Sequence, residues 1–143
     1  MTLPIVEITH RIEFSSAHRL ESPELTPEEN AATYGPCYTD HGHNYALEAT
    51  VRGPVAAKTG MVMNLAHLAE IMHEELWVPM DHKHLNRDVP FLEGIIPTAE
   101  NVAVVSWERI APRLKGVEGC RLHKIRLFES RNNIVEYFGP TEL

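Results

Sequence analysis

Apolar and polar positions alternate with a period of two in the first third of the chain, and this alternation predicts two β-strands. From Pro4 to Phe14, the even positions from 6 onwards are mostly apolar, whereas the odd positions from 7 onwards are polar. A second alternating segment runs from about Asn44 to Arg52, with its apolar residues at odd positions. Such alternation is typical of strands that bury one face. The stretch between them, residues 21 to about 36, is rich in Pro, Glu and Asn and is expected to be a loop.

Two central segments have the periodicity of an amphipathic helix instead. In NLAHLAEIMHEELW (64–77), Asn64 is a candidate N-cap. The apolar residues on one side of this helix are Leu65, Leu68, Ala69, Met72 and Leu76. A second helix is predicted to begin at PTAEN (97–101), with Thr98 as its N-cap and Glu100 near the positive end of the helix dipole. Its apolar stripe consists of Ala103, Trp107, Ile110 and Leu114.

The C-terminal part of the chain predicts a β-hairpin. Its parts are RLHKIRLFE (121–129), the turn SRNN and IVEYF (134–138). Ile125, Leu127 and Glu129 share one face of its first strand. The predicted order is therefore strand, strand, helix, helix, strand, strand, which is an α+β fold. With 143 residues and no repeat or linker, the chain is expected to form a single domain over residues 1–143.

The charge balance argues against a nucleic-acid partner. Thirteen basic residues stand against twenty acidic ones, which gives a formal net charge of −7, and nucleic-acid binding requires a basic surface. The sequence contains no apolar run of 18 residues and no signal-peptide pattern at its start. We therefore expect a cytoplasmic protein that does not bind membranes, with its two cysteines, Cys37 and Cys120, reduced.

The stretch CYTDHGHNY (37–45) contains the candidate metal chemistry. Side chains two residues apart on a strand project from the same face about 6.6 Å apart, so His41 and His43 can converge on one ion. His18 ends the first strand with the parity of its apolar face and is the best third ligand. Three neutral imidazoles suit Zn²⁺. Two alternatives stay open: these are ordinary histidines, or Cys37 is the fourth ligand of a structural site.

A rival metal-site hypothesis comes from Gly35, His41, His43 and Glu48, whose spacing resembles the first motif of a cupin, a β-barrel metalloprotein. In a regular strand, however, Glu48 points away from the face of His41 and His43, and it reaches them only through a bulge. A cupin also has no place for two long central helices. Parity and element order both argue against this fold.

Six strings along the chain resemble the 6-pyruvoyl-tetrahydropterin synthase family. They are FSSAHRL, CYTDHGHNY, MVMNL, MDHKHLN, PTAEN and LFESRNNIVEY, and they occur in the order seen in that family. The resemblance implies the tunnelling fold (T-fold), a four-stranded antiparallel sheet with two helices packed on one face. It also implies a homohexamer, a dimer of trimers whose active sites lie between subunits.

The resemblance further implies a carbon-oxygen lyase that acts on 7,8-dihydroneopterin triphosphate, with Zn²⁺ held by His18, His41 and His43. The fourth position of the metal is then available to a substrate oxygen. Cys37 is thereby freed to remove a proton from the substrate side chain. In MDHKHLN, Asp81 and His82 match the rest of the family's proton relay.

The same resemblance assigns the pterin-binding residues. Glu129 matches the carboxylate that holds the aminopyrimidine edge of the pterin through two parallel hydrogen bonds. Thr98 is a secondary candidate, because helix capping already explains it. The cations that bind the triphosphate stay unassigned, although Arg19, Lys83 and Arg87 lie near the motifs.

Two branches of the family differ in their product, and the motifs conflict. Three residues separate Cys37 from His41, as in the 6-carboxytetrahydropterin synthases of queuosine biosynthesis, which release acetaldehyde. The longer motifs are closer to the branch of tetrahydrobiopterin biosynthesis, so 6-pyruvoyl-tetrahydropterin is the expected product. A non-catalytic, zinc-containing pterin-binding module is a third hypothesis, which the presence of Cys37, Asp81 and His82 disfavours.

Overall fold

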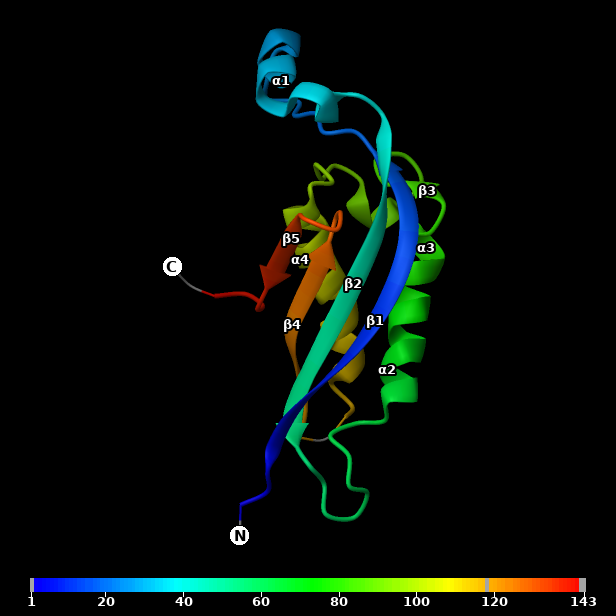
Figure 1. Cartoon of the computed structure of the whole chain (residues 1–143), viewed down its shortest axis with the longest axis vertical. Helices are drawn as coiled ribbons and strands as arrows, with labels where there is room; N and C mark the ends of the chain where they lie inside the picture. The colour runs from blue at the N-terminus through cyan, green and yellow to red at the C-terminus, as the bar shows by residue number, and fades with distance from the viewer. Residues whose placement is uncertain (1, 118, 142–143) are drawn as a thin grey trace.

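Five strands form one mixed sheet in the computed structural model, which describes residues 2–117 and 119–141. The order of the strands is β3-β1-β2-β4-β5 (Figure 1). Their bounds are β1 (Ile5–His18), β2 (His41–Pro54), β3 (Lys83–His84), β4 (Arg121–Phe128) and β5 (Ile134–Tyr137). Neighbouring strands are antiparallel except for β3, which is parallel to β1.

The prediction of a four-stranded antiparallel sheet is wrong in one respect, because β3 adds a fifth strand beside β1. β3 pairs Lys83 with Ser16 and His84 with Ala17. A parallel strand of two residues carries no periodicity from which the sequence could predict it. The other four strands follow the predicted order, and β2 begins at His41, three residues before the predicted start.

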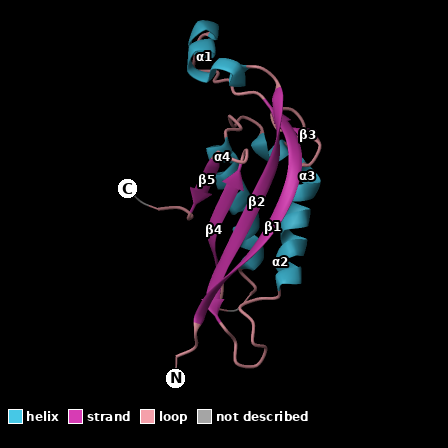
Figure 2. Cartoon of the chain, in the orientation of Figure 1, coloured by secondary structure: helices cyan, strands magenta, loops and turns pink. Residues whose placement is uncertain are grey.

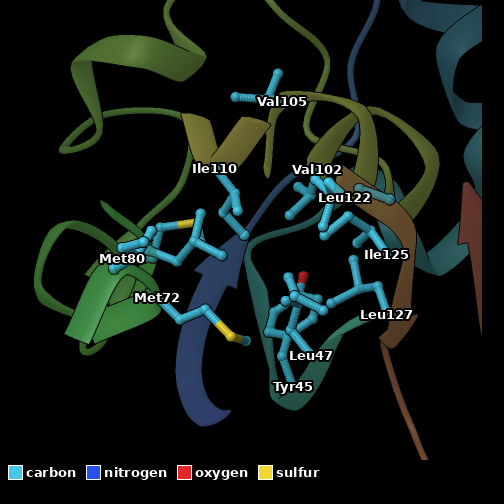
Figure 3. Packing of buried hydrophobic residues seen from close by; sticks show 14 of the residues in the cluster. Tyr45, Leu47, Met72, Met80, Val102, Val105, Ile110, Leu122, Ile125 and Leu127 are labelled. Atoms are coloured by element: carbon cyan, nitrogen blue, oxygen red, sulfur yellow. The ribbon is translucent and has the colours of Figure 1, made fainter. Parts of the chain in front are cut away.

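Helices α2 (Leu65–Met72), α3 (Val78–Met80) and α4 (Ala99–Ile110) cover one face of the sheet (Figure 2). The predicted parity of β1 and β2 is confirmed, because the even positions of β1 and the odd positions of β2 are the more buried ones. Figure 3 shows the core between the layers, where Leu47 and Leu127 are fully buried. No helix in the described part of the chain is long and apolar enough to cross a membrane.

The helix predicted over residues 64–77 is interrupted by a π-helical turn, His73–Trp77. Pro79 lies in the following helical turn, α3, and has no N–H to donate to the carbonyl of Glu75. The Nε of Arg109 on α4 donates to that carbonyl at 2.9 Å instead. Two details of the predicted stripe also change, because Leu65 is exposed whereas Ile71 is buried.

The predicted loop over residues 21–36 contains helix α1 (Pro27–Tyr34), followed by a 3₁₀ turn, Gly35–Tyr38. The helix begins with a reciprocal capping box between Thr26 and Glu29. The TPEE pattern was the available indication, with proline at the first helical position. Figure 1 shows α1 beyond the end of the sheet where β1 finishes and β2 starts. These elements therefore adjoin the three histidines.

Candidate metal centre and adjoining pocket

The last residues of β1 and the first residues of β2 bring His18, His41 and His43 together. His18 pairs with His41 across the two strands, and Ser16 pairs with His43. The imidazole centroids of His18 and His41 are 4.5 Å apart, and each lies 5.1 Å from that of His43. One nitrogen atom from each ring falls within 4.8 Å of the others. Three histidines in this arrangement can hold a metal ion.

Hydrogen bonds orient two of these rings. The Nδ1 of His18 lies 2.8 Å from the carbonyl oxygen of Pro97, and the Nδ1 of His41 lies 2.7 Å from that of Thr39. Because a carbonyl oxygen only accepts, each Nδ1 carries the proton and each Nε2 keeps its lone pair. Backbone acceptors of this kind commonly orient metal-ligating histidines.

The three Nε2 atoms are buried and have no hydrogen-bond partner among the described residues. Buried polar atoms are rarely left without a partner, so this cluster fits a metal ion. Burial lowers the pKa of His18 to about 4. Burial also lowers the pKa of His43, partly offset by the Glu129 carboxylate. Both rings are therefore neutral near pH 7, as metal ligands must be.

Cys37 lies in the 3₁₀ turn before β2 and does not belong to the metal-binding group. No fourth histidine, cysteine or carboxylate of residues 2–117 and 119–141 joins the three histidines. The backbone carbonyl of Cys37 accepts a hydrogen bond from the N–H of Leu20 at 2.9 Å, which ties the turn to the residues after His18. The geometry therefore favours a three-ligand site over a four-ligand one.

Asp81 and His82 form a pair beside β1. The Nδ1 of His82 lies 2.7 Å from the Oδ2 of Asp81, and the Oδ1 of Asp81 accepts from the backbone N–H of Ser15 at 3.0 Å. This backbone donor, together with His82, holds the pKa of Asp81 below its usual value. The side chain of His82 is 81% exposed, and neither residue forms a hydrogen bond with Cys37. One chain thus pairs two of the predicted relay residues, and no hydrogen bond joins this pair to the third.

Glu129 directly follows β4, and its Oε1 lies 4.0 Å from the Nε2 of His43. It shares a hollow of about 510 Å³ with Thr98, whose hydroxyl accepts from the N–H of Asn101 as the N-cap of α4. Glu100 and Tyr34 line the same hollow. The sequence interpretation missed both: helix capping seemed to explain Glu100, and Tyr34 fell in the expected loop.

Comparisons with known proteins agree with this geometry. The family model of 6-pyruvoyl tetrahydropterin synthase matches residues 7–140. The chain belongs to this family. It is 43% identical over 134 residues to the 6-pyruvoyl tetrahydrobiopterin synthase of Dictyostelium discoideum. That alignment covers 94% of this chain and 96% of that protein. The human protein of the same name is 44% identical over 136 residues, covering 93% of this chain and 91% of its own length.

The solved structure of the Caenorhabditis elegans 6-pyruvoyl tetrahydropterin synthase superposes with a TM-score of 0.89 at 36% identity. The alignment covers 98% of this chain and 99% of that structure. The 6-carboxy-5,6,7,8-tetrahydropterin synthase of Rickettsia bellii is more distant, at 26% identity over 148 residues, covering 92% of this chain and 99% of that protein. The match to the tetrahydrobiopterin synthases is therefore the stronger of the two.

Membership of the 6-pyruvoyl tetrahydropterin synthase family rules out the cupin hypothesis, and the structure gives the physical reason. β2 pairs regularly with both neighbours through Glu48, since its single irregularity lies between Thr50 and Val51. The Glu48 carboxylate is 3.3 Å from the Nη1 of Arg11, on the face of the sheet opposite the histidines. The parity argument against a cupin site is confirmed.

Proposed function

We propose that this chain is a zinc-dependent lyase that converts 7,8-dihydroneopterin triphosphate to 6-pyruvoyl-tetrahydropterin with release of triphosphate. The observation that carries the proposal is the set of three buried, unpartnered Nε2 atoms beside Glu129. The 43% identity to a tetrahydrobiopterin synthase over most of the chain supports the choice of reaction. The whole chain, residues 1–143, is proposed to act as one pterin synthase domain.

The metal ligands in this proposal are His18, His41 and His43. A bound Zn²⁺ would supply Lewis acidity toward a substrate oxygen, which acidifies the protons on the neighbouring carbon. Cys37 is the proposed base that removes such a proton. Asp81 orients His82 through their 2.7 Å hydrogen bond, and His82 exchanges the proton with Cys37 or with the substrate.

The hollow beside Glu129 is the proposed pterin site. Its volume of about 510 Å³ lies within the usual range for small-molecule pockets. The partly buried Glu129 carboxylate can accept two parallel hydrogen bonds from the amino group and ring N–H of a pterin, a strong and directional arrangement. Thr98 has a smaller role, because its hydroxyl already caps α4.

The relay requires a second subunit in this proposal, as in a homohexamer built from two trimers. The exposed His82 pairs with Asp81 but forms no hydrogen bond with Cys37 of its own chain. β3 pairs only with Ser16 and Ala17, so among the described residues most of the outer edge of β1 is unpaired, as is that of β5. Unpaired strand edges are suited to joining copies of a chain.

The two cysteines, Cys37 and Cys120, are free thiols, which fits a proposed location in a reducing compartment, the cytoplasm.

The deciding experiment is to incubate the protein with 7,8-dihydroneopterin triphosphate and identify the products by mass spectrometry. We expect inorganic triphosphate and a reduced pterin with a 6-pyruvoyl side chain. Acetaldehyde with a 6-carboxy pterin would instead identify the protein as a 6-carboxytetrahydropterin synthase of queuosine biosynthesis. The three-residue spacing between Cys37 and His41 favours that alternative. Absence of triphosphate release would support a non-catalytic pterin-binding module.

A further inference from the structure

The segment that begins at the last residue of β3, residues 84–88, contacts the neighbours of two of the three clustered histidines. Arg19 comes directly after His18 in the chain. The side-chain amide of Asn86 accepts from the backbone N–H of Arg19 at 2.9 Å and donates to its carbonyl at 2.8 Å. One side chain thus pairs with both backbone groups of Arg19 and extends the edge of the sheet past His18.

Asp40 comes directly before His41, and the same segment holds its carboxylate. One Nη2 atom of Arg87 lies 3.2 Å from Oδ1 and 3.0 Å from Oδ2 of Asp40. The Nε2 of His84 lies 3.1 Å from Oδ1, and the His84 side chain is only 13% exposed. Charge-assisted bonds from two side chains therefore fix the position of Asp40.

This anchoring acts on His41 through one peptide group. The carbonyl of Thr39, which orients the Nδ1 of His41 at 2.7 Å, belongs to the peptide that joins Thr39 to Asp40. A peptide group is planar, so holding Asp40 restricts the direction in which that carbonyl points. Thr39 is held on its other side by the carbonyl of Pro36, which accepts from its hydroxyl at 2.7 Å. The ring of His41 is thereby aimed at His18 and His43.

We propose that Asp40, anchored by Arg87 and His84, is a positioning residue for the metal ligand His41. The proposal rests on the proposed metal site and adds residues outside the ligand set to it. Arg87 and Asp40 are 60% and 49% exposed, and exposed ion pairs contribute little to folding. Losing the anchor should therefore reduce metal affinity more than it reduces stability. Loss of partners that orient a ligand typically weakens metal binding by about 10-fold to 100-fold.

The test compares Asp40→Ala, which removes both contacts, with Arg87→Ala, which removes one of them. Arg113→Ala is the matched control, because Arg113 makes two 2.9 Å ion pairs with Glu74 and Glu75 on the helical layer. The zinc dissociation constant is measured by competition with a chelator, and the visible spectrum of the Co²⁺-loaded protein reports ligand geometry. Urea unfolding of the metal-free protein reports stability.

We expect the dissociation constant to rise about 10-fold to 100-fold in Asp40→Ala, to rise less in Arg87→Ala and to stay unchanged in Arg113→Ala. The Co²⁺ spectrum should change in the first variant, with little shift in its metal-free unfolding midpoint. Wild-type zinc affinity in Asp40→Ala would overturn the proposal. The proposal would also be overturned if the metal-free variant lost as much unfolding free energy as the variant lost in zinc-binding free energy. His41→Ala separates the two levels: if that variant also binds zinc normally, the proposed metal site itself is wrong.

Discussion

Lowering the pH from 7 to 4 should destabilise the metal-free protein, and His18 should account for a large part of the loss. Its side chain is fully buried, and burial lowers its pKa from 6.5 to about 4. In the unfolded chain the ring takes up a proton below pH 6.5, whereas in the folded protein it stays neutral down to about pH 4. The unfolded state therefore binds more protons in this window, and stability falls as the pH falls through it.

The difference between 6.5 and about 4 sets the size of the effect. At about 1.4 kcal/mol for each tenfold change in the ionisation constant, complete protonation of the unfolded state costs about 3 kcal/mol of stability. This contribution is fully present above pH 6.5 and is lost by about pH 4. His43 adds to the loss, because burial lowers its pKa as well. The lowered pKa values of Asp40 and Asp81 act at a lower pH, below their ordinary value of 3.8.

The assay is urea unfolding at several pH values between 7.5 and 4, with chelator present and the protein concentration fixed. His18→Asn is the informative variant, because its amide can still donate to the carbonyl of Pro97 but does not titrate. We expect its stability to depend less on pH than that of the wild type, by about 3 kcal/mol over the window. His67→Asn, at an exposed position of α2, should keep the full dependence. Equal pH dependence in His18→Asn and the wild type would refute the reasoning.

Two further predictions concern the proposed chemistry. Cys37→Ala should keep its zinc while turnover falls by about 100-fold or more, because a general base is lost; Cys120→Ala is the control, and zinc loss in Cys37→Ala would favour the four-ligand site. Glu129→Gln should weaken binding of a pterin product in calorimetry by about 10-fold or more, because a charge-assisted pair is lost. Glu136→Gln, an exposed change on β5, should have no such effect, and unchanged affinity in Glu129→Gln would count against the pterin site.

The parts of the site that depend on local pattern were predictable from sequence. Alternation placed His18 on the buried face of β1 and His41 and His43 on that of β2, and the structure brings these three rings together. The N-cap at Thr98 followed from its position before an amphipathic stretch, and it is confirmed. These inferences succeed because side-chain direction in a strand and capping at a helix start are set within a few residues.

The parts that sequence analysis missed depend on contacts between distant segments. β3 exists because two residues after α3 reach the edge of β1, a pairing that no periodicity encodes. The π-helical turn is joined to α4 by Arg109, whose Nε donates to the carbonyl of Glu75, thirty-four positions earlier in the chain. Asp40 looked like an ordinary loop residue, and its partners Arg87 and His84 lie more than forty positions away. Only the folded chain shows what these residues hold in place.

The register between β1 and β2 explains how one chain brings the three histidines of the candidate metal site together. Because His18 lies opposite His41, the three histidines share a face, and a slip of one residue would turn one strand's ligands to the other face. Asp81 and His82 lie beside β1, where the Oδ1 of Asp81 accepts from the backbone N–H of Ser15 and the backbone N–H of His82 donates to the carbonyl of Ser15 at 2.7 Å. The proposed relay adds Cys37 to this pair, and under that proposal a second copy of the chain supplies the contact that one chain does not form.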